Sequence, residues 1–572
     1  MSREQQRGPQ RVVNAKQASS ECQPKGDREG RAAHFTAKTK DSGPGPERPL
    51  ALPGVLAAAR AESSVRNRRD PPRQRTSGEA GRISAEREVG QCREGVRGGH
   101  STVEAGESRA EGRAPASVTP TVAGKCQGMV TQDETQHPRD NVRKLQRRLW
   151  ACAKRSRTRR FHALYDRVYR SDVLWEAWRR VRKQQGAAGI DGETLAGIEQ
   201  MGIGAWLTSI QTALCEGRYR ASPVRRRYIP KAGGKRRPLG IPTVRDRVVQ
   251  MATKLVIEPI FEADFQASSY GFRPKKSATQ AMEAIRKAGN SGLNWVVDAD
   301  IRSYFDSIDQ EKLMLLLSQR ISDRRVLKLC RKWLRAGVME DGTIRESLAG
   351  TPQGGVISPL FANIYLDAFD RMWQRRCSHL GTLVRYADDF VVLCRWQSQA
   401  KEALRQIERM MQRLGLELHP GKTRLVNLSR GKERFEFLGW TVRKRRSVQR
   451  CPHLHFVQRW PSPRAMQQVR RRVHELTDTR RAGRDIKELI TDLNPVLRGW
   501  GSYFRTGNSD AKFTQLDDYV HWRLKHWLWR RGGQRTRFWP SKWPQERLYG
   551  MGLHQLRTTV DYPHMPRQYD RR

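Results

Sequence analysis

Two adjacent carboxylates, Asp388 and Asp389, lie between two short apolar runs in the segment LVRYADDFVVLC at 383–394. Leucine, valine, tyrosine and phenylalanine favour pleated structure, so this segment predicts a β-hairpin with an acidic tip. In a chain of formal net charge +50, two neighbouring negative charges on apolar strands need a compensating partner. A divalent metal ion removes the repulsion and uses the carboxylate oxygens as ligands, which indicates metal-assisted phosphoryl transfer.

A third carboxylate is available in the segment WVVDADIRSYFDSI at 295–308, where apolar residues mark a strand and Asp300 stands near its end. Asp298 lies on the same face of that strand by period-two alternation, so spacing alone leaves both residues open as ligands. A pair of metal ions about 3.5–4 Å apart requires carboxylates from more than one element. The two segments together therefore predict one site built from a strand and a hairpin.

These segments resemble the boxes of reverse transcriptases. The string YADD, which ends at Asp389, is similar to the metal-binding box of that family. The string DIRSYFD, from Asp300 to Asp306, resembles the upstream box that donates the remaining carboxylate. This resemblance implies Asp300 rather than Asp298 as the ligand and a structural role for Asp306. The implied catalytic residues and Mg²⁺ ligands are Asp300, Asp388 and Asp389, with the backbone carbonyl of Ile301 as a further ligand.

Further boxes follow in the order that the family shows. YIPK and RPLGIP within 228–242 resemble the fingers hairpin of group II intron and related bacterial reverse transcriptases, and YGFRP at 270–274 resembles the next box. TPQGGVISPL at 351–360 resembles the PQG box, whose paired glycines are expected to admit the template and the nascent base pair. The implied contacts to the incoming deoxynucleotide are Lys231 and Arg237 on the triphosphate, Phe305 under the sugar and Gln353 against the nucleotide. For Lys231 and Arg237, the alternative is a basic hairpin that is simply solvated. For Phe305, the alternative is an aromatic side chain of the core.

Two later boxes complete the set. LHPGKT at 418–423 resembles the lysine box, which implies that Lys422 protonates the leaving pyrophosphate as a general acid. A structural or phosphate-steering lysine is the alternative. FLGW at 437–440 resembles the turn that grips the primer terminus.

The elements that position these boxes follow from periodicity. Strand-like and helical runs alternate between residues 228 and 440, which is an α+β pattern. With the resemblance, this predicts a right-hand polymerase whose fingers and palm contain an antiparallel sheet, followed by a basic helical thumb. The expected strands are Arg227–Pro230, Trp295–Ile301, Leu383–Cys394 and Phe435–Trp440; the expected helices are Leu195–Cys215, Val244–Phe261, Gln310–Leu317 and Ala400–Leu414.

The ends of the chain differ from this centre. Residues 1–128 contain one aromatic, Phe35, of the chain's 44, and they carry 23 basic and 15 acidic residues. Such a segment cannot bury enough apolar surface to offset its ordering entropy, which predicts disorder. It is either a basic RNA-binding arm or a non-functional extension ahead of Met129. The predicted domains are a disordered extension (1–130), an N-terminal helical RNA-binding extension (131–225), fingers and palm (226–445), a thumb and maturase domain (455–532) and a basic tail (533–572).

The segment LNPVLRGWGSYF at 493–504 resembles domain X, the thumb and maturase region of group II intron-encoded proteins. Residues 441–572 carry 29 basic and 11 acidic residues with interleaved tryptophans and tyrosines. Lysine and arginine neutralise RNA phosphates while aromatics stack on exposed bases, so Arg498, Trp500 and Tyr503 are predicted RNA contacts. Half of the aromatics are expected in the helix core. A plain polymerase thumb is the alternative for this region.

Composition limits the possible partners. The excess of 109 basic over 59 acidic residues points to nucleic acid as a partner. The sequence contains no run of about 18 apolar residues, so it predicts no membrane span. The nine cysteines are scattered, and Cys451, His453 and His455 are expected to be solvated rather than zinc ligands. Paired cysteines and histidines are missing after 455, which predicts an endonuclease-less type working in the cytoplasm as a ribonucleoprotein. The predicted partners are intron RNA, an RNA template with a DNA primer, a DNA target and deoxynucleotides.

Two other functional classes remain open at this point. One is a non-catalytic RNA-binding splicing factor that keeps the polymerase core as a scaffold. The other is a reverse transcriptase of a defence, CRISPR-associated or diversity-generating system, from which the maturase-like segment at 493–504 distinguishes this chain.

Overall fold

The structure is a computed structural model that describes residues 138–230, 236–340, 342–345, 350–351, 353–447, 454–478, 483–531 and 543–561. The predicted extension over 1–130 lies outside the described residues, as do Lys231, Cys451, His453 and most of the predicted tail. Within the described ranges, no helix is both long enough and apolar enough to cross a membrane.

A four-stranded antiparallel sheet forms the palm, with the strand order β6-β7-β3-β8. This sheet confirms the predicted α+β fold, and the predicted hairpin forms its edge strand and the neighbour of that strand. The strands are β3 (Trp295–Asp300), β6 (Thr382–Tyr386), β7 (Asp389–Cys394) and β8 (Arg424–Asn427).

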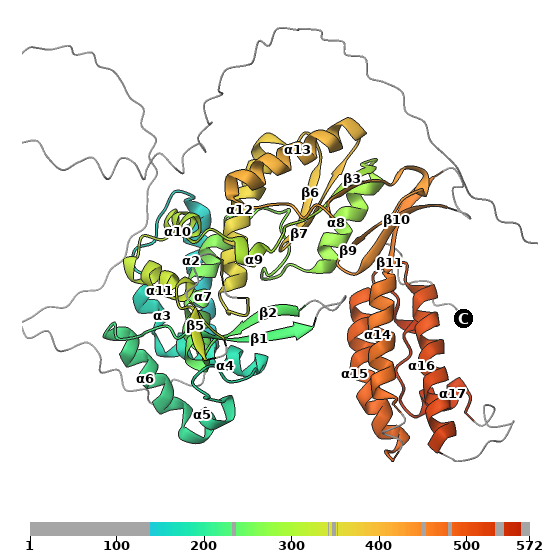
Figure 1. Cartoon of the computed structure of the whole chain (residues 1–572), viewed down its shortest axis with the longest axis horizontal. Coiled ribbons are helices and arrows are strands. Elements are labelled where there is room, and N and C mark those ends of the chain that lie inside the picture. Colours follow the sequence, from blue (N-terminus) through green and yellow to red (C-terminus); the bar gives the residue numbers. More distant parts are fainter. Residues whose placement is uncertain are drawn as a thin grey trace, which may run out of the picture. The chain divides into compact units, whose positions relative to one another are not determined.

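Both faces of the palm sheet are covered (Figure 1). On one face, Phe390 of β7 packs against Phe369 of α12 with ring centroids 5.2 Å apart, and α13 contacts β3 and β7. On the other face, α8 contacts β6 and β7. Burial on two faces explains why the strand FVVLC is almost uniformly apolar. The three helices are α8 (Ala278–Asn290), α12 (Ser358–Arg376) and α13 (Gln397–Leu414).

The N-terminal helices pack around the buried helix α7. Arg320 joins them to the palm side, because its guanidinium donates to four carbonyls at the end of α2, those of Ala153, Ser156, Arg157 and Arg159. The single helix predicted over 195–215 is wrong: Gly202, with φ +99°, separates α5 from α6. The helices are α2 (Pro138–Arg155), α3 (Tyr165–Val168), α4 (Ser171–Gln184), α5 (Leu195–Met201), α6 (Ile203–Cys215) and α7 (Val244–Glu262).

The fingers are built on a second sheet, with the order β2-β1-β4-β5. Strands β1 and β2 form the predicted antiparallel hairpin, while β4 pairs in parallel with the start of β1. Three helices, α9 to α11, lie between β3 and β4 in the sequence. The bounds are β1 (Val224–Pro230), β2 (Arg236–Ile241), β4 (Val338–Glu340), β5 (Thr343–Arg345), α9 (Tyr304–Ser307), α10 (Gln310–Ser318) and α11 (Arg324–Leu334).

A third sheet leads into the thumb helices, where α14 contacts both α15 and α16. The strand-like run at 435–440 contains a turn at Leu438 (φ +50°) and Gly439 (φ +77°), inside the FLGW segment that resembles a turn. The region after about 455 is mostly helical as predicted, although it begins with a strand. The elements are β9 (Phe435–Phe437), β10 (Trp440–Arg446), β11 (His455–Pro461), α14 (Pro463–Leu476), α15 (Ile486–Phe504), α16 (Asp510–Arg531) and α17 (Gln545–Gly550).

Candidate active site

The three aspartates singled out from the sequence meet at one edge of the palm sheet. Asp300, the last residue of β3, is the register partner of Asp389, the first residue of β7. Asp388 lies in the two-residue turn between β6 and β7, because Tyr386 pairs with Asp389 across that turn. Carboxylates separated by 88 positions in the chain therefore become neighbours.

The neighbouring carboxylates perturb one another. Partial burial, and then the charges of Asp388 and Asp300, raise the pKa of Asp389 to about 7, although the residue as a whole remains exposed. Burial also raises the pKa of Asp388, to which the charge of Asp300 contributes. An uncompensated group of acids resists full ionisation, so a cation that binds there stabilises the ionised form.

Two basic residues distinguish Asp300 from Asp298. Arg424 of β8 is the cross-strand partner of Asp298 and donates from Nε to its Oδ2 at 3.0 Å. The ammonium of Lys422 contacts the carboxylate of Asp300 instead. Asp298 is therefore neutralised by a residue of the neighbouring strand. Asp300 instead faces Asp389, and its partner is the exposed side chain of Lys422. This arrangement supports the choice of Asp300 that spacing left open.

The metal ligands remain a prediction. Within the described part of the chain, no three aspartate, glutamate, histidine or cysteine side chains converge closely enough to hold a metal ion as they stand. The donor chemistry nevertheless suits a hard divalent cation, because Asp300, Asp388 and Asp389 offer carboxylate oxygens alone. Lys422 contacts one oxygen of Asp300, and the other oxygen remains as a possible ligand. Ile301, the predicted backbone ligand, is buried and forms an isolated antiparallel β-bridge with Leu418.

The acidic turn is strained and is held from beneath. Ala387 has φ +59°, a left-handed conformation that costs free energy for a residue with a β-carbon. The fully buried guanidinium of Arg385 donates to the carbonyl of Ala387 at 2.9 Å and to both carboxylate oxygens of Asp370 at 2.8 and 2.5 Å. Gly271 packs so closely that a β-carbon there would lie 2.3 Å from the nitrogen of Ala387. Sequence reasoning missed Arg385, although a lone cation inside an apolar strand was a visible signal.

Two of the predicted nucleotide contacts, Arg237 and Gln353, lie in one hydrogen-bonded chain. The amide of Gln353 donates to the carboxylate of Asp306 at 3.0 Å, and its oxygen accepts from Nε of Arg237 at 2.8 Å. Arg237 is on β2, Asp306 is on α9 and Gln353 is in the PQG loop, so the chain joins fingers to palm. The sequence placed Arg237 and Gln353 together, but it missed that Asp306 orients the amide between them.

Gly354 of the PQG loop makes a close contact that the sequence did not predict. A β-carbon at Gly354, where φ is +119°, would lie 2.2 Å from the carbonyl oxygen of Gly240 on β2. Gly240 in turn donates its backbone N–H to the carbonyl of Gln353 at 2.6 Å. The close approach therefore docks this loop on the fingers strand. Phe305 is half-buried and packs edge-to-face on Tyr304 with centroids 5.5 Å apart.

The predicted RNA contacts on α15 have mixed surroundings. The ring of Trp500 packs against Phe504 and Phe513, with centroids 4.8 and 5.4 Å away, so it belongs to the thumb core. Arg498 is exposed. Tyr503 is 37% exposed and donates its hydroxyl to the carbonyl of Leu438. Exposed rings are found instead on α16, where Trp522, His526 and Trp529 form a row with centroids 5.5 and 5.7 Å apart.

Comparison with known proteins agrees with this geometry. The sequence model of the family described as "Reverse transcriptase (RNA-dependent DNA polymerase)" matches residues 229–442. The model described as "Group II intron, maturase-specific domain" matches residues 466–543. Protein YkfC of Escherichia coli K12 is 34% identical over 344 residues, which cover 54% of this chain and 89% of YkfC.

This chain belongs to the group II intron reverse transcriptase and maturase family. The group II intron-encoded protein LtrA of Lactococcus lactis is 30% identical to this group II intron reverse transcriptase over 357 residues. The match covers 50% of this chain and 57% of LtrA, so the chain spans little more than half of that relative. A solved "Partial Cas6-RT-Cas1--Cas2 complex" is 28% identical over 44% of this chain and 41% of that chain, and its TM-score of 0.28 carries no argument about the fold. Membership of the family implies use of a divalent metal ion and binding of intron RNA.

Proposed function

We propose that the protein elongates a DNA primer on an RNA template, with Asp300, Asp388 and Asp389 as the ligands of two Mg²⁺ ions. The observation that carries this proposal is the pairing of Asp300 with Asp389 beside Asp388 at one sheet edge. When bound there, the ions activate the attacking hydroxyl and stabilise the charge that develops on the leaving oxygen. In the reaction, the 3′-hydroxyl of the primer attacks the α-phosphate of a deoxynucleotide and pyrophosphate leaves.

The protein's own residues bind and orient the nucleotide. Arg237 and Lys231 hold the triphosphate, and Gln353 contacts the nucleotide in an orientation that Asp306 fixes through its amide. Phe305 packs under the sugar and excludes a 2′-hydroxyl. Lys422, whose ammonium contacts Asp300, donates a proton to the leaving pyrophosphate.

We further propose that the protein binds its host intron RNA, assists splicing in the cytoplasm and copies the intron into DNA at a DNA target. The match of residues 466–543 to the maturase-specific domain supports this role. Arg498 and Tyr503 on the exposed side of α15 contact RNA, whereas Trp500 supports them from the core.

Extension of oligo(dT) on poly(rA) with Mg²⁺ tests the polymerase proposal. We expect the full chain to extend the primer and Asp388→Ala to be inactive. Assisted splicing of the RNA that flanks the gene, assayed at low Mg²⁺, should persist in Asp388→Ala because RNA binding does not need this carboxylate. Assisted splicing by a wild-type protein that extends no primer would identify a non-catalytic splicing factor instead.

A further inference from the structure

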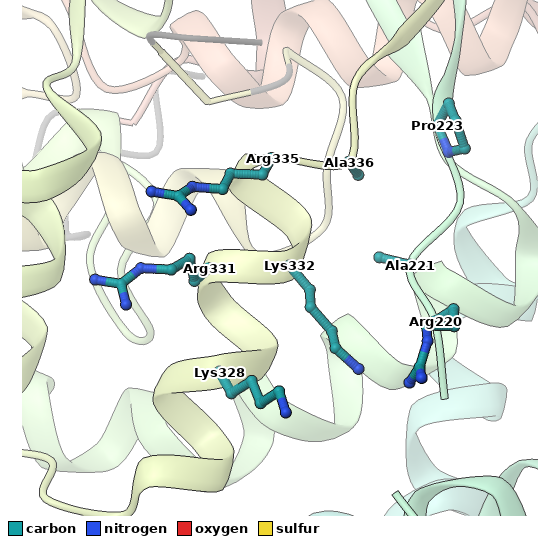
Figure 2. A pocket seen from close by; sticks show the side chains of 8 residues that line it. All are labelled: Arg220, Ala221, Pro223, Lys328, Arg331, Lys332, Arg335 and Ala336. Atoms are coloured by element: carbon teal, nitrogen blue, oxygen red, sulfur yellow. The ribbon is translucent and has the colours of Figure 1, made fainter. Parts of the chain in front are cut away.

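A pocket of about 480 Å³ opens between α11 and the segment that leads into β1. Its charged lining consists of cations alone, which are Arg220, Lys328, Arg331, Lys332 and Arg335 (Figure 2). We call these five residues and the space between them the basic pocket. None of them belongs to the palm sheet or to the predicted nucleotide contacts.

The cations of α11 follow one face of the helix. Positions 328, 331, 332 and 335 have the i, i+3, i+4 and i+7 spacing, while Val326, Leu329, Cys330 and Trp333 are buried on the other side. Like charges at this spacing repel one another and destabilise a helix. The eleven residues of α11 include five cations and no acid. On α13, by contrast, Glu402 and Glu408 are interspersed among the cations. Helix α11 itself therefore supplies no acid to balance its positive charge.

Two of the five cations have an internal partner. Arg331 and Arg335 both contact Glu311, at 3.3 and 3.1 Å. Figure 2 shows their guanidinium groups pointing away from Arg220, whereas the ammonium groups of Lys328 and Lys332 point toward it. Among the described residues, no carboxylate lies within ion-pair distance of Arg220, Lys328 or Lys332. These three residues form the unbalanced part of the pocket.

A buried tyrosine holds two of these cations together. Lys332 Nζ and Arg220 both donate to the carbonyl of Tyr219, at 2.6 and 3.3 Å. The hydroxyl of Tyr219 donates to Asp246 at 2.5 Å and accepts from Trp333 at 2.9 Å, so its backbone is a rigid support. Burial, and then the charges of Arg220 and Lys328, lower the pKa of Lys332. The cations are therefore close enough to repel one another, and a bound anion would relieve that repulsion.

We propose that the basic pocket binds a phosphate group in the backbone of the structured RNA that this protein carries. This proposal rests on the proposed RNA-binding function and assigns part of it to the fingers. A phosphodiester suits the pocket because three convergent cations attract its negative charge and offer N–H donors to its oxygens, and a site of this volume falls in the range of about 300–1,000 Å³ typical of ligand pockets.

The basic pocket is separate from the predicted nucleotide contacts. Arg220 to Pro223 precede β1, and the seven residues of β1 then run roughly 20 Å to the hairpin turn at about 3.3 Å per residue. An RNA strand held at the base of the fingers therefore need not occupy the place of the incoming nucleotide. Because β4 pairs with the start of β1, binding there also braces the fingers sheet.

A charge-matched pair of variants tests the proposal. The pocket variant combines Arg220→Gln, Lys328→Gln and Lys332→Gln. The control variant combines Lys401→Gln, Arg405→Gln and Arg409→Gln, which remove the same charge from exposed positions of α13. The probe is a labelled RNA hairpin whose 3′ end is blocked, and its dissociation constant is measured over a range of salt concentrations in the full-length protein. A short RNA template with a DNA primer is present at saturation to fill the polymerase site.

We expect the pocket variant to bind the hairpin about tenfold more weakly and to lower the slope of log K against log salt by about 1, since the pocket holds one phosphate and each lost phosphate contact removes about 1. The control variant should change both quantities by much less. Lys328→Arg should bind like the wild type and Lys328→Glu should bind still more weakly, which excludes a folding defect. Equal losses in the pocket and control variants would overturn the proposal. The proposal would also be overturned if inorganic phosphate displaced the hairpin from the wild type but not from the variants, because the pocket would then be a site for free phosphate.

Primer extension on the short template separates this result from the polymerase proposal. A pocket variant that loses hairpin binding but still extends the primer supports the basic pocket. A wild-type protein that binds the hairpin through the pocket yet extends no primer would refute the polymerase proposal alone.

Discussion

The palm contains two groups of aspartates in opposite surroundings. In the structural group, Asp370 is fully buried, and its two oxygens accept from Nε and Nη2 of Arg385. Asp264 contacts Arg320 at 2.9 Å, and Asp367 contacts Arg371 at 2.5 Å. Each carboxylate of this group therefore has a guanidinium with a fixed position.

In the catalytic group, Asp300, Asp388 and Asp389 share a single lysine contact within the described part of the chain, from the exposed side chain of Lys422 to Asp300. A buried charge needs a permanent partner, since an unpaired one costs several kcal/mol. Carboxylates whose cation can be exchanged must remain accessible from the surface, and they repel one another there. The difference teaches that the palm neutralises the acids that hold it together and leaves the three acids of the proposed metal site available.

The comparison predicts the largest effect for a catalytic carboxylate. Asp388→Ala should reduce primer extension by at least about 10³-fold, equivalent to about 4 kcal/mol of activation free energy, because a shared ligand is lost. The melting temperature without metal should remain the same or rise, since the substitution removes repulsion. Primer-extension rates and thermal melting measure the two effects. Extension at the wild-type rate would refute the metal assignment.

The structural group should show the reverse pattern. Arg385→Met leaves the buried carboxylate of Asp370 and the carbonyl of Ala387 unpaired, so we expect a loss of about 3–5 kcal/mol in the free energy of unfolding. Lys422→Met removes a cation from the exposed pair and should cost less than about 1 kcal/mol. Urea unfolding of both variants measures the difference. Similar losses of unfolding free energy in the two variants would show that the two groups of aspartates do not differ in how strongly they depend on their cation.

A smaller effect is expected at Asp306, which belongs to neither group of aspartates. Asp306→Asn weakens the hydrogen bond that orients the amide of Gln353, so the Michaelis constant for the deoxynucleotide should rise about three- to tenfold, or about 1 kcal/mol. The turnover number should change little. Glu417→Gln is the matched control, because it neutralises an exposed carboxylate outside this chain of hydrogen bonds. A fall in turnover with an unchanged Michaelis constant would contradict the positioning role.

The smallest effect concerns pH. Burial raises the pKa of Asp367 to about 7, even though Arg371 lowers it. Because the folded pKa lies above the unfolded value, its contribution to stability is lost as pH rises from about 4 through 7. The free energy of unfolding should fall by about 1 kcal/mol more between pH 6 and pH 8 in the wild type than in Asp367→Asn. Parallel pH profiles of the two proteins, from chemical denaturation, would contradict this assignment.

The sequence predicted the palm well because its signals are local. Alternation within 295–300 and 383–394 marked the strands, and the YADD string marked the turn, so the placement of Asp300 near Asp388 required only that the strands pair. The bounds were coarser at 195–215, where a glycine at 202 with positive φ divides the helical region into two helices. The FLGW turn, by contrast, coincides with the positive φ at Leu438 and Gly439.

The supports of the site were harder to predict because they depend on tertiary contacts. Arg385 pairs with Asp370, fifteen residues earlier on α12, and nothing in either segment identifies the other as its partner. The chain from Asp306 through Gln353 to Arg237 joins elements more than a hundred residues apart. A family motif indicates which side chains react, whereas the arrangement that holds them becomes visible only after folding.

The guanidinium of Arg320 sets a limit on protein engineering at the amino terminus. It is almost entirely buried and satisfies four carbonyls around the end of α2. A shortened version that starts after this helix would remove the carbonyl of Ala153 from that buried guanidinium, together with the helix that leads into its other three acceptors. Truncations intended to trim the protein should therefore keep everything from Pro138 onward, even if polymerisation alone is wanted.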